Sequence, residues 1–392
     1  MKKTGHASSK KTSSDKQRSQ KQRSPASSPR HGEYTLAETL SQPAIWAETV
    51  KQLERQGTLK RLGAVFSSRR PWLMVACGSS YYLAQVVAEL WAKYFHIPCT
   101  VVPASELLFA PEEILRNSGA EQAVLISRSG ETTEVLRAGE LLQSHGNIVT
   151  LGVTCNTGGA LEKLCNHTLK LPWADEKSMV MTRSFTAMLL MFQRLGARVS
   201  GNTQLASVLD HIPEKAQQWL DGNADKIRAF GAKRKFADYV FLGQGAHYWL
   251  AQEAALKITE MSSSYAQAYY TLEFRHGPRS IASRDTLITF LISDAAAAEE
   301  ALIVNELKQL RAATLVVANR ATPALQRCSD LLISLDMDEP EFARFPVTAI
   351  PAQLLGAAIG VRKGLNPDAP KNLTRAVVLG SNESDPIRRS DT

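Results

Sequence analysis

The chain has 392 residues, an apolar fraction of 44% and a formal net charge of +8. This length predicts two domains with sizeable cores, and the composition is typical of a globular protein. All of the excess charge lies in residues 1–32, which hold nine Lys and Arg against one acid, so the other 360 residues carry 37 basic and 37 acidic groups. A neutral body argues against a nucleic-acid-binding protein.

Residues 1–32 are rich in Ser, Lys, Gln and Arg and have no apolar periodicity. This pattern predicts a disordered basic tail. The segment has neither the apolar stretch of a signal peptide nor the amphipathic apolar face of an organellar transit peptide. We expect the tail to be inert, with a contact to nucleic acid or to an anionic surface as the alternative.

The most apolar long stretch, residues 345–361, is interrupted by Pro346, Pro351 and Gln353. We therefore expect no membrane-spanning helix and no membrane partner. The five cysteines form no CxxC pair and have no nearby His at the spacing of metal ligands. They indicate reduced thiols in a cytoplasmic protein rather than a disulfide framework or a zinc site.

From residue 34 onward, helical patterns alternate with short apolar runs. A helical pattern over residues 34–56 is interrupted at Pro43. Five apolar runs follow as predicted strands, at residues 72–76, 97–102, 123–126, 148–153 and 168–171. Helical patterns follow the first and third of these strands. Strands alternating with helices predict an α/β domain of three layers, with a parallel sheet flanked by helices on both faces.

The same pattern recurs in the second half of the chain, which predicts a tandem duplication. Strand 238–242 runs into a glycine-containing turn and a long helix, and Trp249-Leu-Ala-Gln252 matches Tyr82-Leu-Ala-Gln85 of the first half. Aligning Gly78 with Gly243 requires a two-residue insertion. The predicted organisation is a tail at 1–32, helices and the first domain at 33–204, a helical connector at 205–230, the second domain at 231–380 and a C-terminal tail at 381–392.

The two halves differ in the loop after the third strand. The first half has Ser127-Arg128-Ser129-Gly130-Glu131-Thr132, and the second half has Ser293-Asp294 followed by alanines. Hydroxyls and free backbone N–H groups at the positive end of a helix can hold a phosphate. This predicts one phosphate site, in the first half, which Ser80 of the neighbouring turn is able to join. The alternative is an ordinary turn capped by Ser and Thr.

The second half carries candidate acid–base residues. Glu253, Lys257 and Glu260 are spaced at i, i+4 and i+7, which places them on one face of a helix. His276 follows in a Gly-Pro turn and is a candidate acid or base. The alternatives are a solvated ladder of ion pairs for the helix and a structural role for the histidine.

The chain resembles the SIS (sugar isomerase) proteins. The resemblance extends to the isomerase part of glutamine–fructose-6-phosphate amidotransferase and to stand-alone amino-sugar-phosphate deaminases and isomerases. It covers roughly residues 34–380, and its motifs occur in order at residues 76–80, 105–106, 127–132, 182–186, 253–260, 273–278 and 372–375. The fold implied is two tandem SIS domains.

The resemblance also implies roles for individual residues. The implied phosphate ligands are Ser80, Ser127, Arg128 (usually Gln in the family), Ser129 and Thr132. Glu260 is implied as the base that moves a proton between C1 and C2 of the sugar, and His276 as the group that opens the ring. That histidine is supplied by the partner subunit of a homodimer. Glu253 and Lys257 line the site, with Lys257 counted among the catalytic residues, and no metal or other cofactor is implied.

Three departures from the family refine this expectation. The amidotransferase begins with a glutaminase domain, where this chain has its polar tail, so we expect a deaminase or isomerase rather than a synthase. Arg375 replaces a sugar-contacting lysine, and a guanidinium does not readily form an imine. Met181 replaces a Ser, and with the preceding residues 176–178 it resembles the branch of galactosamine- and glucosamine-phosphate deaminases.

The expected reaction converts a hexosamine 6-phosphate to a ketose 6-phosphate and releases ammonia. Glu260 would remove the proton next to the open-chain carbonyl, which a carboxylate does best if burial raises its pKa toward neutrality. Two alternatives stay open. One is a simple aldose–ketose phosphate isomerase, and the other is a sugar-phosphate-binding regulator without catalysis, although no helix-turn-helix precedes the first domain.

Overall fold

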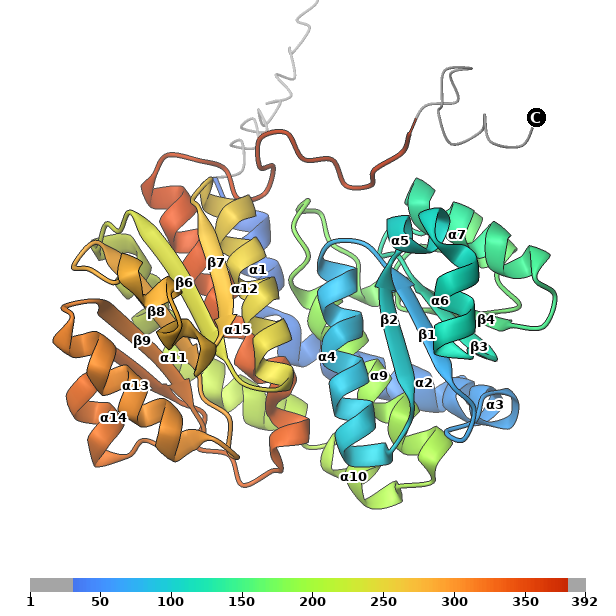
Figure 1. Ribbon diagram of the computed structural model, residues 1–392, viewed down its shortest axis with the longest axis horizontal. Helices are drawn as coiled ribbons and strands as arrows, with labels where there is room; N and C mark the ends of the chain where they lie inside the picture. The colour runs from blue at the N-terminus through green and yellow to red at the C-terminus, as the bar shows by residue number, and fades with distance from the viewer. Residues whose placement is uncertain (1–30, 380–392) are drawn as a thin grey trace, which may run out of the picture. The chain divides into compact units, whose positions relative to one another are not determined.

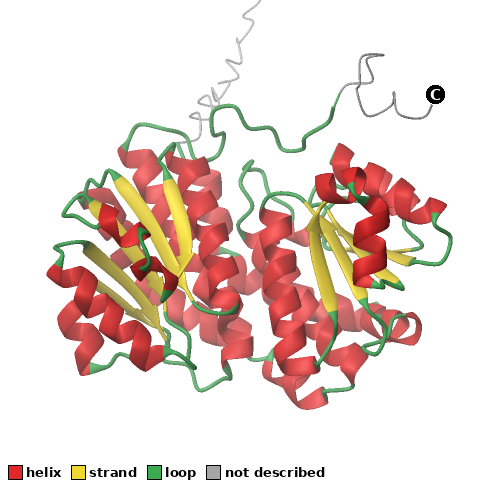
Figure 2. Cartoon of the chain, in the orientation of Figure 1, coloured by secondary structure: helices red, strands yellow, loops and turns green. Residues whose placement is uncertain are grey.

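The computed structural model describes residues 31–379 and contains two five-stranded sheets (Figures 1 and 2). Most of the predicted basic tail, and the C-terminal tail predicted at 381–392, lie outside the described residues. The first sheet has the order β2-β1-β3-β4-β5, with β1 Trp72–Ala76, β2 Cys99–Pro103, β3 Gln122–Ile126, β4 Val149–Thr154 and β5 His167–Lys170. The second has the order β10-β9-β8-β6-β7, with β6 Asp238–Gly243, β7 Ala266–Tyr270, β8 Thr286–Leu291, β9 Ala313–Ala318 and β10 Leu331–Ser334.

Neighbouring strands in both sheets are parallel, so the predicted α/β class with two tandem domains is confirmed. Every residue of β1, β3, β8 and β9 is buried, which explains why these strands are continuous apolar runs in the sequence. The first half contains α1 Glu33–Leu40, α2 Gln42–Arg55, α3 Thr58–Val65, α4 Ser79–Phe95, α5 Ala104–Phe109, α6 Pro111–Ser118, α7 Thr133–Ser144, α8 Ala160–Leu164, the 3-10 turn η1 Pro172–Ala174 and α9 Arg183–Ser200.

The stretch predicted as a helical connector, 205–230, contains most of α10 Thr203–Val208 and most of α11 Ile212–Lys233. The second half contains α12 Ala246–Ser262, the 3-10 turns η2 Glu273–Arg275 and η3 Pro278–Ile281, α13 Ala297–Gln309, α14 Pro323–Cys328 and α15 Glu341–Arg362. The interrupted pattern at residues 34–56 is two helices, and Pro43 lies in the first turn of α2. A proline is tolerated there because the first helical N–H groups have no partner within the helix.

The internal repeat is more regular than the sequence alignment suggested. Gly78 precedes α4 with φ 56° and ψ −132°, and Gly245 precedes α12 with φ 56° and ψ −133°. Gln85 donates to the Tyr81 hydroxyl at 2.8 Å, and the Gln252–Tyr248 pair repeats this contact at 2.6 Å. The equivalent of Gly78 is therefore Gly245 and not Gly243, and the predicted two-residue insertion at this point was wrong. Glycine is required because other residues rarely adopt this positive φ.

The C-terminal helix α15 is continuous, so the prediction that its prolines break the apolar stretch was wrong. Pro346 leaves the Phe342 carbonyl without its helical donor, and the side-chain amide of Gln193 donates to that carbonyl instead. By length and composition α15 could cross a membrane, but 94% of its most apolar window is buried inside the protein. It packs against α11 and α12 in the core.

Helices α4 and α12 lie side by side between the two sheets (Figure 1). A hydrogen bond joins Lys257, near the end of α12, to Ser79 at the start of α4. A pocket near the opposite ends is lined by Lys93 of α4 and His247 of α12. The two helices are therefore antiparallel, and the last turn of α12 lies at the carboxyl edge of the first sheet.

Candidate active site

The serine-rich loop after β3 forms a cluster of hydroxyls at the first turn of α7. The Ser127 Oγ lies 2.9 Å from the Thr132 Oγ1 and 3.3 Å from the Ser129 Oγ. Gly130 has a φ of 70° and its backbone N–H donates to the Ser127 Oγ at 3.1 Å. The structure thus brings three of the predicted phosphate ligands together at a helix N-terminus, where an anion is favoured.

Ser80 lies at the same edge of the first sheet. It is buried in the first turn of α4, and its Oγ is 3.8 Å from the Met181 sulfur. Because β1 and β3 pair in register up to Ala76 and Ile126, the loops that follow them begin side by side. This places Met181, a departure from the family, directly against a predicted phosphate ligand.

The Arg128 side chain contacts the loop that contains Glu176 and the segment that contains Arg375. Its guanidinium forms a buried ion pair with Glu176 at 3.2 Å and donates to the carbonyl oxygens of Met179, at 2.8 Å, and Arg375, at 3.3 Å. Glu176 in turn accepts from the backbone N–H of Thr182 at 2.6 Å. In this structure the Arg128 side chain therefore supports the neighbouring loop, and its role in phosphate binding stays a prediction.

Arg375 lies on the segment that follows α15. Its guanidinium pairs with Asp175 and donates to a backbone carbonyl in the same loop. Two residues later the Val377 carbonyl accepts from the Thr133 N–H at 3.1 Å, at the start of α7. This segment, with Arg375 on it, lies next to the serine-rich loop, as the predicted substrate-binding role requires.

The acid–base face of α12 meets the first half through Lys257. The Lys257 Nζ lies 2.5 Å from Glu260, 3.3 Å from Glu253 and 2.9 Å from the Ser79 Oγ. The side chains of Lys257 and Glu253 are 1% and 3% exposed, so the alternative of a solvated ladder does not hold for them. Glu260, at 17% exposed, is the member of the group that solvent reaches.

Glu253 is the more deeply buried of the two carboxyl groups, at 3% exposed against 17% for Glu260. Burial raises the pKa of Glu253 to about 7, because water no longer solvates the charged form. Burial acts to lower the pKa of Lys257, but the charges of Glu253 and Glu260 outweigh it and the pKa is raised. Lys257 is therefore a fixed cation beside the Glu260 carboxylate.

His276 lies far from Glu260 within one chain. Glu260 is in the last turn of α12, which leads to the start of β7, whereas His276 follows the far end of β7 and is exposed. The five residues of β7 alone span roughly 16 Å. One chain therefore does not bring the two predicted catalytic residues together.

Two contributors to this arrangement were not predicted. Ser79 orients Lys257, and Glu176 is the buried anion that fixes Arg128. Both belong to sequence motifs named above. Ser79 and Lys257 are 178 residues apart, and Arg128 and Glu176 are 48 residues apart, so no local pattern in the sequence indicates these contacts. Among residues 31–379 there is no group of three His, Cys, Asp or Glu side chains arranged to hold a metal ion.

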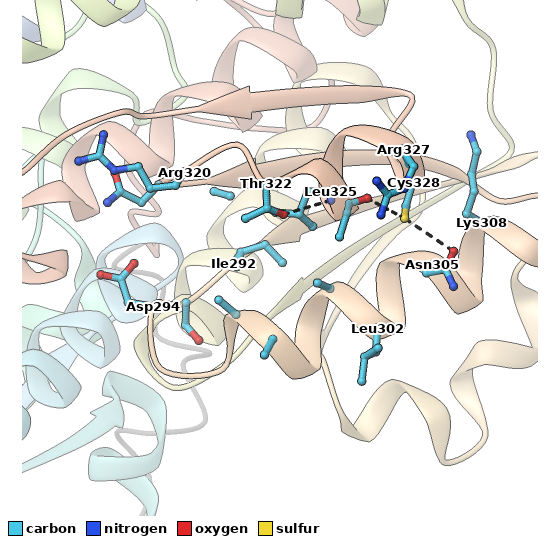
Figure 3. A pocket seen from close by; sticks show the side chains of 17 residues that line it. Ile292, Asp294, Leu302, Asn305, Lys308, Arg320, Thr322, Leu325, Arg327 and Cys328 are labelled. Carbon is cyan, nitrogen blue, oxygen red and sulfur yellow. Dashed lines mark hydrogen bonds between the residues drawn. The ribbon is translucent and has the colours of Figure 1, made fainter.

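A cavity of about 940 Å³ lies elsewhere, at the carboxyl ends of β8 and β9 (Figure 3). It runs between α13 and α14, with Asp294 and Arg320 at one end and Asn305, Lys308 and Arg327 at the other. None of the predicted site residues lines it. We take the serine-rich loop and the end of α12 as the candidate active site because the hydroxyl cluster and the Lys257–Glu260 pair both lie at the carboxyl edge of the first sheet.

Curated relatives match most of this chain. Glutamine–fructose-6-phosphate aminotransferase (isomerizing) of Methanothermobacter thermautotrophicus is 26% identical over 336 residues, which are 85% of this chain and 54% of that protein. The enzyme of the same name from Pyrococcus horikoshii is 29% identical over 314 residues, 78% of this chain and 51% of that protein. The chain thus spans about half the length of these relatives.

Solved structures share the whole described architecture. Glucosamine-6-phosphate deaminase of Thermotoga maritima has a TM-score of 0.72 at 28% identity, covering 88% of this chain and 100% of that chain. Tagatose-6-phosphate ketose/aldose isomerase of Escherichia coli has a TM-score of 0.78 at 20% identity, covering 89% and 97%, which shows the shared fold. The SIS domain model matches residues 66–198 and 237–357, one segment in each half. The chain therefore belongs to the SIS domain family, as its sequence motifs predicted.

Proposed function

We propose that this protein converts a hexosamine 6-phosphate to a ketose 6-phosphate and ammonia. The observation that carries the proposal is the placement of Lys257 and Glu260 at the carboxyl edge of the first sheet, where Ser79 joins the two halves. Phosphate-binding hydroxyls and a carboxylate with a fixed cation are the groups that aldose–ketose chemistry on a sugar phosphate requires.

The phosphate binds at the serine-rich loop. Ser127, Ser129 and Thr132 direct their hydroxyls to one place beside the N-terminus of α7, and Ser80 belongs to the adjoining turn. Hydrogen bonds from hydroxyls and backbone N–H groups to a charged oxygen are among the strong ones, so this loop anchors the substrate. Arg375 approaches from the C-terminal segment.

Glu260 acts as the base in the proposed reaction. Its carboxylate takes the proton from C2 of the open-chain aldehyde and, after exchange with water, delivers a proton to C1, so that the amino-bearing carbon becomes an imine. Water hydrolyses this imine to the ketone, and ammonia leaves. The Lys257 Nζ lies 2.5 Å from a Glu260 carboxylate oxygen and stabilises the ionised form of Glu260. Glu253 helps to hold the lysine in place.

His276 opens the sugar ring from the partner subunit of a homodimer. Support for this assignment comes from the distance within one chain, since His276 and Glu260 belong to opposite ends of β7. A twofold dimer presents the same surface from both subunits, so each chain would supply its histidine to the other. The five cysteines are free thiols, in agreement with a cytoplasmic location, which stays a prediction.

Release of ammonia is supported by the likeness to the Thermotoga maritima deaminase, which this chain matches over that protein's full length. The alternative is aldose–ketose isomerisation without loss of ammonia. The test is a panel of glucosamine, galactosamine and non-amino hexose 6-phosphates with purified protein, with ammonia and ketose phosphate both measured. Equal amounts of the two products from one hexosamine phosphate support the proposal, and ketose or aldose interconversion without ammonia contradicts it.

A further inference from the structure

The second half repeats the backbone elements that surround the predicted phosphate site. We call these elements the frame: a glycine turn that leads into one helix, and a loop after the neighbouring strand that leads into another. Gly245 and α12 correspond to Gly78 and α4, and the loop after β8 leads into α13 as the serine-rich loop leads into α7. A pocket of about 180 Å³ lies between these two helix starts and the last turns of α4. Its position in the second half is equivalent to that of the candidate active site in the first.

A carboxylate of the chain itself occupies this second frame. Glu341, the first residue of α15, accepts a hydrogen bond from the Asp294 backbone N–H at 2.7 Å through one oxygen. Its other oxygen accepts from the Lys93 Nζ at 2.8 Å. Asp294 lies at the end of the cavity in Figure 3, and its own side chain is paired with Arg344. Glu341 is 9% exposed, so its charge is held by these partners rather than by water.

The charges of the two frames are reversed. Lys93 and Glu260 each lie in the last turn of their helix, and each is fifteen positions beyond its equivalent glycine, Gly78 or Gly245. The first frame therefore has a carboxylate on the helix end and open hydroxyls for an anion. The second has a cation on the helix end and a built-in anion, and its loop keeps one hydroxyl, Ser293, followed by Asp294 and alanines.

The groups around Glu341 favour its ionised form. Burial acts to raise the pKa of Glu341, but His247, Lys93 and the Asp294 N–H outweigh it and lower the pKa. The Tyr94 hydroxyl also faces it and lies 3.4 Å from one carboxylate oxygen. His247 is buried 3.9 Å away, and burial lowers its pKa to about 4.

We propose that the second half holds a degenerate anion site in which the Glu341 carboxylate takes the place of a ligand phosphate. Each chain then binds a single phosphate group, in the first half, because the equivalent position is already filled. Removing the carboxylate leaves Lys93, the Asp294 N–H and the starts of α12 and α13 facing an enlarged pocket. That pocket is a site for inorganic phosphate or sulfate. The comparison of the two halves rests on the proposed phosphate site, but the effect of removing Glu341 does not.

The test is equilibrium dialysis with radiolabelled inorganic phosphate. We compare the wild type, Glu341→Ala and the double variant Glu341→Ala/Lys93→Ala at matched ionic strength. Glu341→Ala should bind one more phosphate per chain than the wild type. The added Lys93→Ala should weaken that extra site by about 10-fold or more, since hydrogen bonds to charged groups are the strong ones. Both residues lie outside the proposed catalytic group.

The wild-type stoichiometry tests the proposed function separately, because a wild type that binds no phosphate has no phosphate site in its first half. The inference depends only on the difference between variants. It is overturned if Glu341→Ala binds no more phosphate than the wild type, or if Lys93→Ala leaves the extra site unchanged. Should the alanine variant fail to fold, Glu341→Ser opens the same space. Phosphate should then raise its thermal midpoint more than it raises that of the wild type, and an equal rise overturns the inference.

Discussion

The Nζ atom of Lys257 lies 2.9 Å from the Oγ atom of Ser79, although 178 residues separate them in the chain. This contact connects the acid–base helix of the second half to the phosphate-binding edge of the first. Neither half holds both groups, so the proposed active site requires the duplication. The antiparallel packing of α4 and α12 brings the two together.

The serine-rich loop should determine affinity for the phosphate group. Replacing Ser127 and Ser129 by Ala should raise KM for the hexosamine 6-phosphate, because each lost hydrogen bond to a charged oxygen costs about 1.5–3 kcal/mol. Steady-state kinetics on the phosphorylated and unphosphorylated sugar measure the effect. A variant whose KM for the phosphate ester is unchanged would remove the loop from the site.

The buried pair of Arg128 and Glu176 should matter for stability. Glu176→Ala leaves a buried guanidinium without its counter-charge, which costs about 3–5 kcal/mol of the free energy of unfolding. Urea denaturation measures this loss, and Arg128→Met/Glu176→Met is the matched control. The double variant should be more stable than Glu176→Ala. If both are as stable as the wild type, the pair is dispensable.

Glu253 should give the protein a pH-dependent stability. Its pKa in the folded state is about 7, above the ordinary 4.5, so the group favours folding while it is protonated. This contribution is complete below about pH 4.5 and is lost as the pH rises through 7. Glu253→Gln should remove that part of the decline in the free energy of unfolding. Urea denaturation of both proteins at about pH 5 and about pH 8 tests this. The prediction is contradicted if the free energy of unfolding changes between the two pH values by the same amount in both proteins.

Sharing of His276 between subunits can be tested with hybrid dimers. Glu260→Gln and His276→Asn should each be nearly inactive. When the two are mixed and allowed to exchange subunits, half of the dimers are hybrids, and each hybrid has one intact site. About a quarter of the wild-type activity should return if the histidine crosses a twofold interface. Mixtures as inactive as the separate variants would show that it does not.

The sequence was sufficient to predict the parallel sheets and the duplication, because buried parallel strands and glycine turns leave local signals. It also pointed to the hydroxyls that cluster after β3 and to the face of α12 that carries Lys257, whereas the roles of these residues stay predictions. Contacts between distant segments leave no such signal. The continuity of α15 depends on Gln193 of another helix. The direction of Arg128 depends on Glu176, and the raised pKa of Glu253 depends on how deeply the folded chain buries this carboxyl. Placing Gly245 opposite Gly78 required the backbone angles of both turns.

The most direct test of the account is proton exchange at Glu260. Glu260→Gln keeps the shape of the side chain and removes the base, so kcat should fall by about 10²–10⁴-fold with little change in substrate affinity. The measurement is turnover of the hexosamine 6-phosphate in deuterated water, with deuterium at C1 of the ketose product detected by mass spectrometry. Deuterium should appear at C1 in the wild-type reaction, and in the variant both turnover and deuterium incorporation should be slower by that same factor. A variant that incorporates deuterium at the wild-type rate, or a wild type that binds the sugar phosphate and exchanges no proton, would contradict it.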